Sequence, residues 1–181
     1  MNQCVRIIGG KYRGKKLPFP IAEGLRPTPD RVKETLFNWL MHDIRAARCL
    51  DAFAGSGALG FEALSRGAAE VVMVEQSATV FSHLKKIAPA FADEKLLLWQ
   101  GDALLYLQKE KKPFDIIFLD PPFSGDCLTE CVAIIANKNS LRQGGLLYIE
   151  SPTNLTLPAE MWHQRKIKRA GQVFYMLYEK L

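Results

Sequence analysis

The chain has 181 residues, of which 48% are hydrophobic and 24% are charged, the composition of an ordinary globular protein. This length fits one domain with a substantial core, and no apolar run approaches the roughly 18 residues that cross a bilayer. The start lacks a signal-peptide pattern and the four cysteines form no CxxC pair, so we expect a cytoplasmic protein with reduced thiols, no metal site and no membrane partner.

The net charge of +5 is concentrated near the two ends of the chain. Residues 1–29 are rich in lysine and arginine against Glu23 alone, and a second basic cluster, HQRKIKR, occupies 163–169. Basic ends around a neutral middle suggest a polyanionic partner. A solvated surface that only keeps the protein soluble explains the same charges equally well.

The first part of the chain predicts an arm followed by a helix. Residues 4–17, CVRIIGGKYRGKKL, alternate weakly around glycines and predict a small hairpin. A proline-rich connection follows over 18–29, where Thr28 is placed to cap a helix that has Pro29 at its first position. Apolar residues at helical spacing then extend this helix through DRVKETLFNWLMHDI.

From residue 47 onward, strands and helices alternate. The predicted strands are continuous apolar runs, as in a parallel sheet covered by helices on both faces: ARCLDAF, EVVMVE, KLLLWQGD, FDIIFLD and GGLLYIES. Helical segments separate them, and residues 165–180 predict an antiparallel hairpin around Gly171. We therefore expect one α/β domain over 1–181, with residues 1–28 as a basic extension.

A glycine loop, DAFAGSGALG (51–60), joins the first of these strands to a helix. Gly55, Gly57 and Gly60 match the pattern G-x-G-x-x-G, and Glu75 ends the next strand 20 residues after Gly55. Such glycines let a ligand approach the backbone, and the acid accepts hydrogen bonds from ribose hydroxyls. Taken alone, the pattern fits a nicotinamide-dinucleotide enzyme, or a tight turn needed only for packing.

Acidic residues at strand ends favour another adenosine ligand, S-adenosylmethionine. Asp51 can reach the ammonium of an amino-acid group, whereas it would repel a pyrophosphate. Asp102, in QGDA, can accept a hydrogen bond from an adenine amino group, although Asp102 and Glu75 can also serve as helix caps. The candidate cofactor-binding residues are Asp51, Ala54, Gly55, Ser56, Gly57, Gly60, Glu75, Gln76, Asp102 and Ala103.

The fourth strand runs into Asp120, Pro121, Pro122 and Phe123, the candidate catalytic residues. Prolines end a strand and stiffen the loop after it. The Asp120 carboxylate and the Pro121 carbonyl can accept hydrogen bonds from both hydrogens of an amino group, which turns its lone pair toward a methyl donor. Phe123 offers a stacking face for a base. This arrangement suits methylation of an amino nitrogen; the alternative is a rigid turn with Phe123 in the core.

In this order, DAFAGSGALG, VVMVE, QGDA, DPPF and GGLLYIE resemble the class I S-adenosylmethionine-dependent amino-methyltransferases. The segments VRIIGGKYRGKKL and LRPTPDRVKETLFNWL resemble one family among them, the bacterial RsmD-type 16S rRNA (guanine-N2)-methyltransferases. The resemblance implies a Rossmann-like α/β fold with a seven-stranded, mostly parallel sheet, a C-terminal antiparallel hairpin and a small N-terminal β-hairpin extension.

The resemblance also implies a monomer that converts S-adenosylmethionine to S-adenosylhomocysteine. Its partner would be 16S rRNA in a 30S subunit or an assembly intermediate, methylated at the exocyclic N2 of a guanine. The residues that would grip RNA through its phosphates are Lys11, Tyr12, Arg13, Lys15, Lys16, Arg26 and Arg31.

Other functions share part of this pattern. A DNA adenine or cytosine amino-methyltransferase and a protein-amide methyltransferase use the same acid-Pro-Pro-aromatic chemistry. The first usually needs a separate recognition region, and the second leaves the basic arm unexplained. A non-catalytic RNA-binding module with this fold would bind S-adenosylmethionine without turnover.

Overall fold

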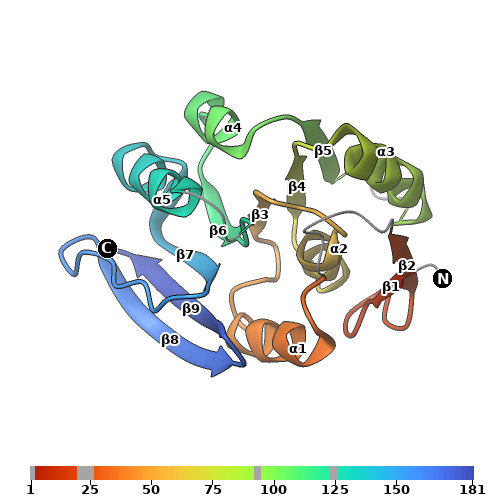
Figure 1. The fold of residues 1–181 in the computed structure, drawn as a ribbon, viewed down its shortest axis with the longest axis horizontal. Coiled ribbons are helices and arrows are strands. Elements are labelled where there is room, and N and C mark those ends of the chain that lie inside the picture. The colour runs from red at the N-terminus through yellow and green to blue at the C-terminus, as the bar shows by residue number, and fades with distance from the viewer. Residues whose placement is uncertain (1–2, 20–26, 92–94, 123–125) are drawn as a thin grey trace.

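A central sheet with helices on both of its faces organises the chain (Figure 1). The structure, a computed structural model, describes residues 3–19, 27–91, 95–122 and 126–181. In spatial order the sheet contains β5 (Leu96–Gln100), β4 (Glu70–Glu75), β3 (Arg48–Asp51), β6 (Phe114–Leu119), β7 (Leu141–Ser151), β9 (Val173–Lys180) and β8 (Trp162–Ala170). This arrangement confirms the expected α/β class and the seven-stranded sheet.

The strand order explains where a ligand can bind. Strands β5, β4, β3, β6 and β7 are parallel, whereas β9 runs antiparallel between β7 and β8. The chain begins the sheet at β3, builds outward to β5, and then returns to place β6 on the other side of β3. Doubly wound sheets bind ligands at such a reversal, at the carboxyl ends of the strands.

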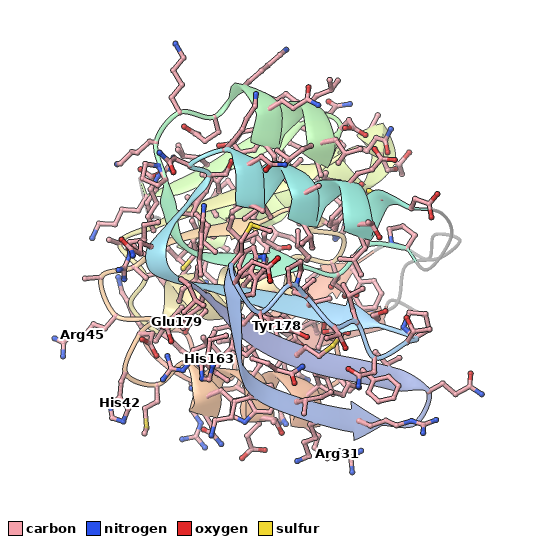
Figure 2. All side chains as sticks on the ribbon, turned by 90° about the vertical axis from the view of Figure 1, so that its left-hand side faces the viewer. Arg31, His42, Arg45, His163, Tyr178 and Glu179 are labelled. Carbon is pink, nitrogen blue, oxygen red and sulfur yellow. The ribbon has the colours of Figure 1, made fainter. Side chains whose placement is uncertain are left out.

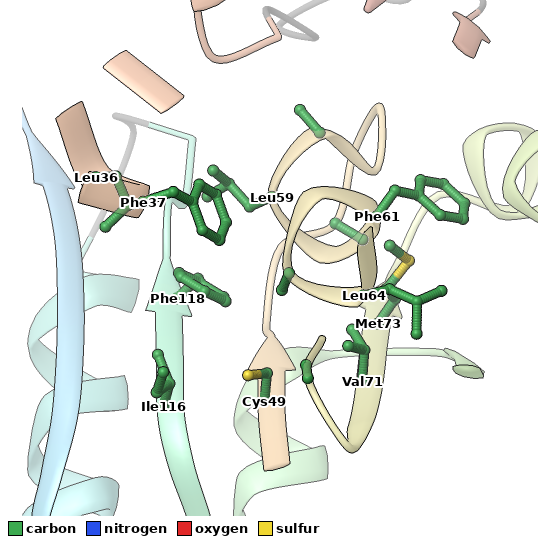
Figure 3. Packing of buried hydrophobic residues seen from close by; sticks show 14 of the residues in the cluster. Leu36, Phe37, Cys49, Leu59, Phe61, Leu64, Val71, Met73, Ile116 and Phe118 are labelled. Carbon is green, nitrogen blue, oxygen red and sulfur yellow. The ribbon is translucent and has the colours of Figure 1, made fainter. Parts of the chain in front are cut away.

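Two apolar layers separate the sheet from its helices. The helices are α1 (Asp30–Trp39), α2 (Ala58–Ser65), α3 (Ala78–Ile87), α4 (Ala103–Lys109) and α5 (Cys127–Asn137), with a short 3-10 helix, η1 (Ala88–Phe91), after α3. Buried side chains of α1, α2 and α3 form one cluster with the sheet, and those of α4 and α5 form the other. Figure 3 shows part of the first cluster, in which Phe37 of α1 and Phe118 of β6 have ring centroids 6.0 Å apart. Successive strand residues face opposite layers, which is why the strands are apolar throughout.

The N-terminal hairpin is fastened to α2 by a buried carboxylate. Strands β1 (Gln3–Arg6) and β2 (Lys16–Phe19) pair antiparallel, as expected. Glu62 of α2 is fully buried and accepts backbone hydrogen bonds from Ile8 and Gly9, both at 2.9 Å. Its Oε1 also pairs with Arg66 Nε at 2.8 Å. One side chain therefore holds the start of the hairpin loop against the helix that follows the glycine loop.

Helix α1 begins differently from the sequence expectation. The N-cap position is Pro29, without a capping hydrogen bond from a side chain, and Thr28 is buried with its side chain hydrogen-bonded to Glu150. The hydroxyl is used by a distant carboxylate because that group is buried and needs a donor. Lys33 is also fully buried, and its Nζ lies 2.5 Å from the Arg6 carbonyl and 3.1 Å from Asp30 Oδ1.

The structure also bears on the expectations about the cysteines and about membrane crossing. All four cysteines are unpaired, with Cys49 and Cys131 buried, Cys127 partly exposed and Cys4 exposed. Among the described ranges, no helix combines the length and apolar character that a bilayer crossing requires.

Replacing Glu62 with alanine should destabilise the protein by about 3 kcal/mol, since two backbone N–H groups and the Arg66 guanidinium lose a buried acceptor. Urea unfolding would measure the loss, and hydrogen exchange should speed up at the amides of Ile8 and Gly9. Glu34→Ala, an exposed change on α1, is the matched control. Equal unfolding curves for the two variants would contradict the anchoring role of Glu62.

Candidate active site

Carboxylates gather at the carboxyl edge of the sheet, on both sides of the point where the strand order reverses. Asp51 ends β3, Glu75 ends β4, Asp120 follows β6, and Glu150 lies near the end of β7. The register aligns these ends, because Asp51 pairs with Phe118 of β6 and with Met73 of β4. The sheet therefore brings together three acids that the sequence singled out, and adds Glu150.

The glycine loop is held by two of these carboxylates. Asp51 Oδ2 accepts a hydrogen bond from the Gly60 amide at 2.9 Å, and Glu75 Oε2 accepts one from the Gly55 amide at 2.9 Å. Glu75 Oε1 accepts another from the Ser77 amide at 2.7 Å. Both acids therefore fix the conformation of the loop through its backbone amides. Ala54 and Ser56 are buried within the loop, and Gln76 is exposed just after β4.

Two of the glycines are required by local packing. Gly57, with φ +77°, is the N-cap of α2, and a Cβ there would lie 2.4 Å from the Phe61 ring. A Cβ on Gly60 would lie 2.2 Å from Met73 Cε. Packing thus accounts for these glycines in part, while the close passage of the backbone over the edge of the sheet also leaves room for a ligand.

Asp102 serves as the cap of α4. Its Oδ1 accepts a hydrogen bond from the Leu105 amide at 3.0 Å, and its side chain is partly exposed. The following Ala103 is buried in the α4 layer. Asp102 stands after β5, two strands from β3, so it is in position to contact the far end of an extended ligand while it caps the helix.

Burial, with smaller contributions from neighbouring charges, raises the pKa values of Asp51 and Asp120. Burial raises the pKa of Asp51 to about 7, with smaller contributions from the charges of Asp120 and Glu75, although the Gly60 amide opposes the shift. Burial also raises the pKa of Asp120 well above its usual range, and the neighbouring Glu150 charge adds to that effect. A cluster of this kind is suited to bind a cation, which restores the charged forms of the carboxyl groups.

Glu150 was not singled out by the sequence. Burial raises its pKa to about 7, whereas hydrogen bonds from the side chains of Tyr148 and Thr28 oppose the shift. The Tyr148 hydroxyl donates to Glu150 Oε1 at 2.8 Å. The only available signal was an acid near the end of a further strand, in the run YIES, which the same edge argument would have included.

The DPPF loop is described only in part. Asp120 is partly exposed, Pro121 is buried and Pro122 is exposed, directly after β6. Phe123 and Arg26 lie outside the described residues. The roles of these candidate residues stay predictions, as do those of the cofactor and RNA sets.

The basic arm divides into packed and exposed residues. Tyr12 donates its hydroxyl to the Phe91 carbonyl and packs edge-on against the Phe91 ring, with centroids 4.9 Å apart. Lys15 donates to the Ala90 carbonyl. Lys11, Arg13 and Lys16 are exposed, and so is Arg31 on α1. In this structure Tyr12 and Lys15 thus connect the arm to η1, while the exposed cations are available to a polyanion.

The raised pKa of Asp51 generates a prediction about stability. Between about pH 4 and pH 7 the folded state holds a proton that the unfolded chain has lost, so the free energy of unfolding should fall as pH rises through this window. Asp51→Asn keeps an acceptor for the Gly60 amide and should flatten this slope. Its stability should exceed that of the wild type at pH 8 by on the order of 2 kcal/mol.

Urea unfolding at pH 5 and pH 8 measures this difference, with exposed Asp43→Asn as the matched control. If the free energy of unfolding changed with pH as steeply in Asp51→Asn as in that control, the raised pKa could not be assigned to Asp51.

Comparison with known proteins identifies the family of the chain. The family model described as conserved hypothetical protein 95 matches residues 5–179. Ribosomal RNA small subunit methyltransferase D of Escherichia coli (strain K12) is 43% identical over 178 residues, covering 97% of this chain and 90% of the relative. The protein of the same name from Haemophilus influenzae is 44% identical over 180 residues, covering 97% of this chain and 93% of the relative.

Solved structures give the same result for the fold. The structure of yhhF from Escherichia coli has a TM-score of 0.91 and 44% identity, and the match covers 98% of each chain. An rRNA methylase from Streptococcus thermophilus is only 14% identical, over 85% of this chain and 98% of that one, yet it has a TM-score of 0.66, which supports the fold alone. The expected Rossmann-like methyltransferase fold is thereby confirmed. Family match and relatives together place the chain in the RsmD-type methyltransferase family.

Proposed function

We propose that this methyltransferase transfers a methyl group from S-adenosylmethionine to the exocyclic N2 amino group of a guanine in 16S rRNA. The observation that carries the proposal is the position of Asp120-Pro121 beside Asp51, at the edge where the sheet order reverses. The names of the two relatives above, which refer to ribosomal RNA of the small subunit, support the class of substrate. The nicotinamide enzyme that the glycine loop alone would fit has no such support.

The donor set fits S-adenosylmethionine. Buried carboxyl groups with raised pKa values gain most from a positively charged ligand, and this cofactor carries an ammonium and a sulfonium. Asp51 would hold the ammonium, Glu75 the ribose hydroxyls and Asp102 the adenine amino group. S-adenosylmethionine supplies the methyl group when bound, and S-adenosylhomocysteine is the product.

Asp120 and Pro121 would hold the guanine. The Asp120 carboxylate accepts one hydrogen of the amino group, and the Pro121 carbonyl accepts the other. As the new N–C bond forms and the S–C bond breaks, positive charge develops on N2, and the Asp120 carboxylate stabilises it. The proton then leaves N2 for Asp120. Pro121 and Pro122 keep the acceptors in place, so most of the rate comes from positioning; Phe123 would stack on the base.

The exposed cations would bind the RNA backbone. Lys11, Arg13 and Lys16 lie on the hairpin that Glu62 fastens to α2. Phosphates bound by these side chains would therefore be held in a fixed position relative to the sheet. Binding through phosphates weakens steeply with salt. We propose that the protein acts as a monomer, and that its substrate is 16S rRNA within a 30S subunit or an assembly intermediate.

Asp120→Asn should lower the single-turnover rate by about 100-fold or more, because the amide is neutral and cannot take the proton. The measurement is transfer of labelled methyl to 30S particles, free 16S rRNA and duplex DNA, all unmodified, followed by nucleoside analysis. Cofactor affinity should change little, and exposed Asp43→Asn should retain full activity.

N2-methylguanosine recovered from 30S or 16S material would support the proposal and identify the preferred form. Label in DNA or in another nucleoside would overturn the substrate, and a fully active Asp120→Asn variant would overturn the mechanism.

Activity should also depend on pH through Glu150. Because burial and the Glu150 charge raise the pKa of Asp120, the wild-type rate should rise with pH as Asp120 loses its proton. Glu150→Gln removes that charge but keeps an acceptor for the Tyr148 hydroxyl, so the midpoint of the profile should move to lower pH. Single-turnover rates between pH 6 and 9 test this, with exposed Glu160→Gln as control. Superimposable profiles would exclude a coupling of Glu150 to Asp120.

A further inference from the structure

A pocket of about 110 Å³ lies between α1 and the β8–β9 hairpin, outside the residues assigned to the cofactor. Figure 2 shows Arg31 of α1 beside this hairpin. The pocket is lined by Arg31, Val32, Thr35, Leu36, Trp39, Tyr148, Lys168, Arg169, Ala170 and Tyr175. Its volume is well below the roughly 300–1,000 Å³ of pockets that enclose a drug-sized molecule, so it suits one ring-sized group.

The lining selects an anion attached to an aromatic ring. Arg31 and Lys168 supply positive charge, and no acidic side chain lines the pocket among the residues that the structure describes. Trp39 and Tyr175 supply aromatic surface, and stacking on such rings is how proteins hold bases of single-stranded RNA. A nucleotide of an unpaired RNA strand combines both chemical groups.

Arg169 borders the pocket, but its side chain lies on the other face of the sheet. Its Nε donates to the Gly171 carbonyl at 3.0 Å, and its guanidinium carbon lies 5.2 Å from the centroid of the Phe174 ring, which packs against the α4–α5 layer. Lys168 pairs with Tyr175 on the face that α1 covers, because neighbouring strand residues face opposite sides of a sheet. The charge inside the pocket therefore comes from Arg31 and Lys168.

The sheet connects this pocket to Asp120. Lys168 of β8 lies opposite Tyr175 of β9, and Tyr175 lies opposite Glu150 of β7. The pairing of Leu119 with Ile149 places Asp120 beside Glu150 in the same row. Tyr175 is thus two strand spacings, or about 10 Å, from Asp120.

The pKa of Tyr175 and a hydrogen bond of Tyr148 also indicate that the pocket lies close to Asp120 and Glu150. Burial and the charges of Glu150 and Asp120 raise the pKa of Tyr175, while the charge of Arg31 lowers it. Tyr148 lines the pocket and also donates its hydroxyl to Glu150. The pocket and Asp120 therefore adjoin the same buried carboxylate.

We infer that this pocket binds the nucleotide next to the methylated guanine. Arg31 and Lys168 hold its phosphate, and its base stacks against Trp39 and Tyr175. The inference rests on the proposed function, because the neighbouring nucleotide is defined only when the target lies at Asp120. The competing explanation is that β8, an edge strand, carries lysine and arginine only to prevent strand-to-strand association.

The test compares Arg31→Gln and Lys168→Gln with Lys166→Gln. Lys166 is an exposed cation of the same strand that does not line the pocket, so it controls for the general loss of charge. Steady-state methylation of unmodified 30S subunits, run at several salt concentrations, gives KM and kcat for each variant. Each pocket variant should raise the KM for 30S about tenfold with kcat nearly unchanged, and should reduce the salt dependence of log KM by about 0.7 per lost phosphate contact. Lys166→Gln should change KM less than twofold.

A second measurement addresses the base. Once the methylated position is mapped, RNA fragments with an abasic nucleotide on either side of it are offered to the wild type and to Trp39→Ala, after thermal unfolding has confirmed that the variant is folded. One abasic side should lower wild-type kcat/KM about tenfold, and that side should make no further difference to Trp39→Ala. If Trp39→Ala does not fold, the abasic effect is compared between the wild type and Lys168→Gln.

The possible outcomes test the proposed function and the role of the pocket separately. Wild-type protein that methylates no RNA overturns the proposed function and this inference with it. Active wild type with pocket variants that match Lys166→Gln, or that lower kcat alone, overturns the pocket only. Equal sensitivity of wild type and pocket variant to the abasic sites overturns the stacking role.

Discussion

The burial of carboxyl groups at the carboxyl edge of the sheet, Asp51 and Glu150 fully and Asp120 in part, is the constraint on which the rest of the structure depends. Asp51, Glu75, Asp120 and Glu150 come from strands that are neighbours in the sheet, so their ends cannot be separated without changing the fold. Backbone amides and hydroxyls satisfy part of this charge, but raised pKa values remain for Asp51, Asp120 and Glu150. On the proposed function, a bound cation would recover the stability that this arrangement costs.

The hydrogen-bond donors that offset this charge also determine how the rest of the chain is attached. Gly60 and Gly55 donate to the strand-end acids and thereby fix the glycine loop. Thr28 bonds to Glu150 and so ties the entrance of α1 to the edge of β7. Lys33 then ties α1 to the Arg6 carbonyl at the end of β1. The electrostatics of the site thus extend into contacts that position α1 between the sheet and the hairpin.

Sequence patterns predicted the sheet, and the common edge at which most of the candidate acids lie, because both depend on the order of strands and loops along the chain. Strand ends in a parallel sheet share an edge, so Asp51, Glu75 and Asp102 could be placed together from their positions after apolar runs. Glu150 was missed because no loop motif follows it. Thr28 was assigned to capping because Thr-Pro-Asp is a good helix start, yet its hydroxyl serves a carboxylate over a hundred residues away. Such long-range partners leave no periodic signal, and the packed roles of Tyr12 and Lys15 were hidden for the same reason.

The separation of the basic groups bears on the kind of substrate that the protein can hold. The exposed cations of the hairpin lie beside α2 and η1, whereas those of the pocket lie between α1 and β8–β9. The strand-end carboxylates belong to the strands in the middle of the sheet. A free nucleotide could engage only one of these regions. A folded RNA can engage both while one unpaired segment enters the site, and each region then contributes affinity through phosphates without contacting the methylated base. If the proposed function holds, the arm would provide general affinity, and the pocket would fix the strand that presents the guanine.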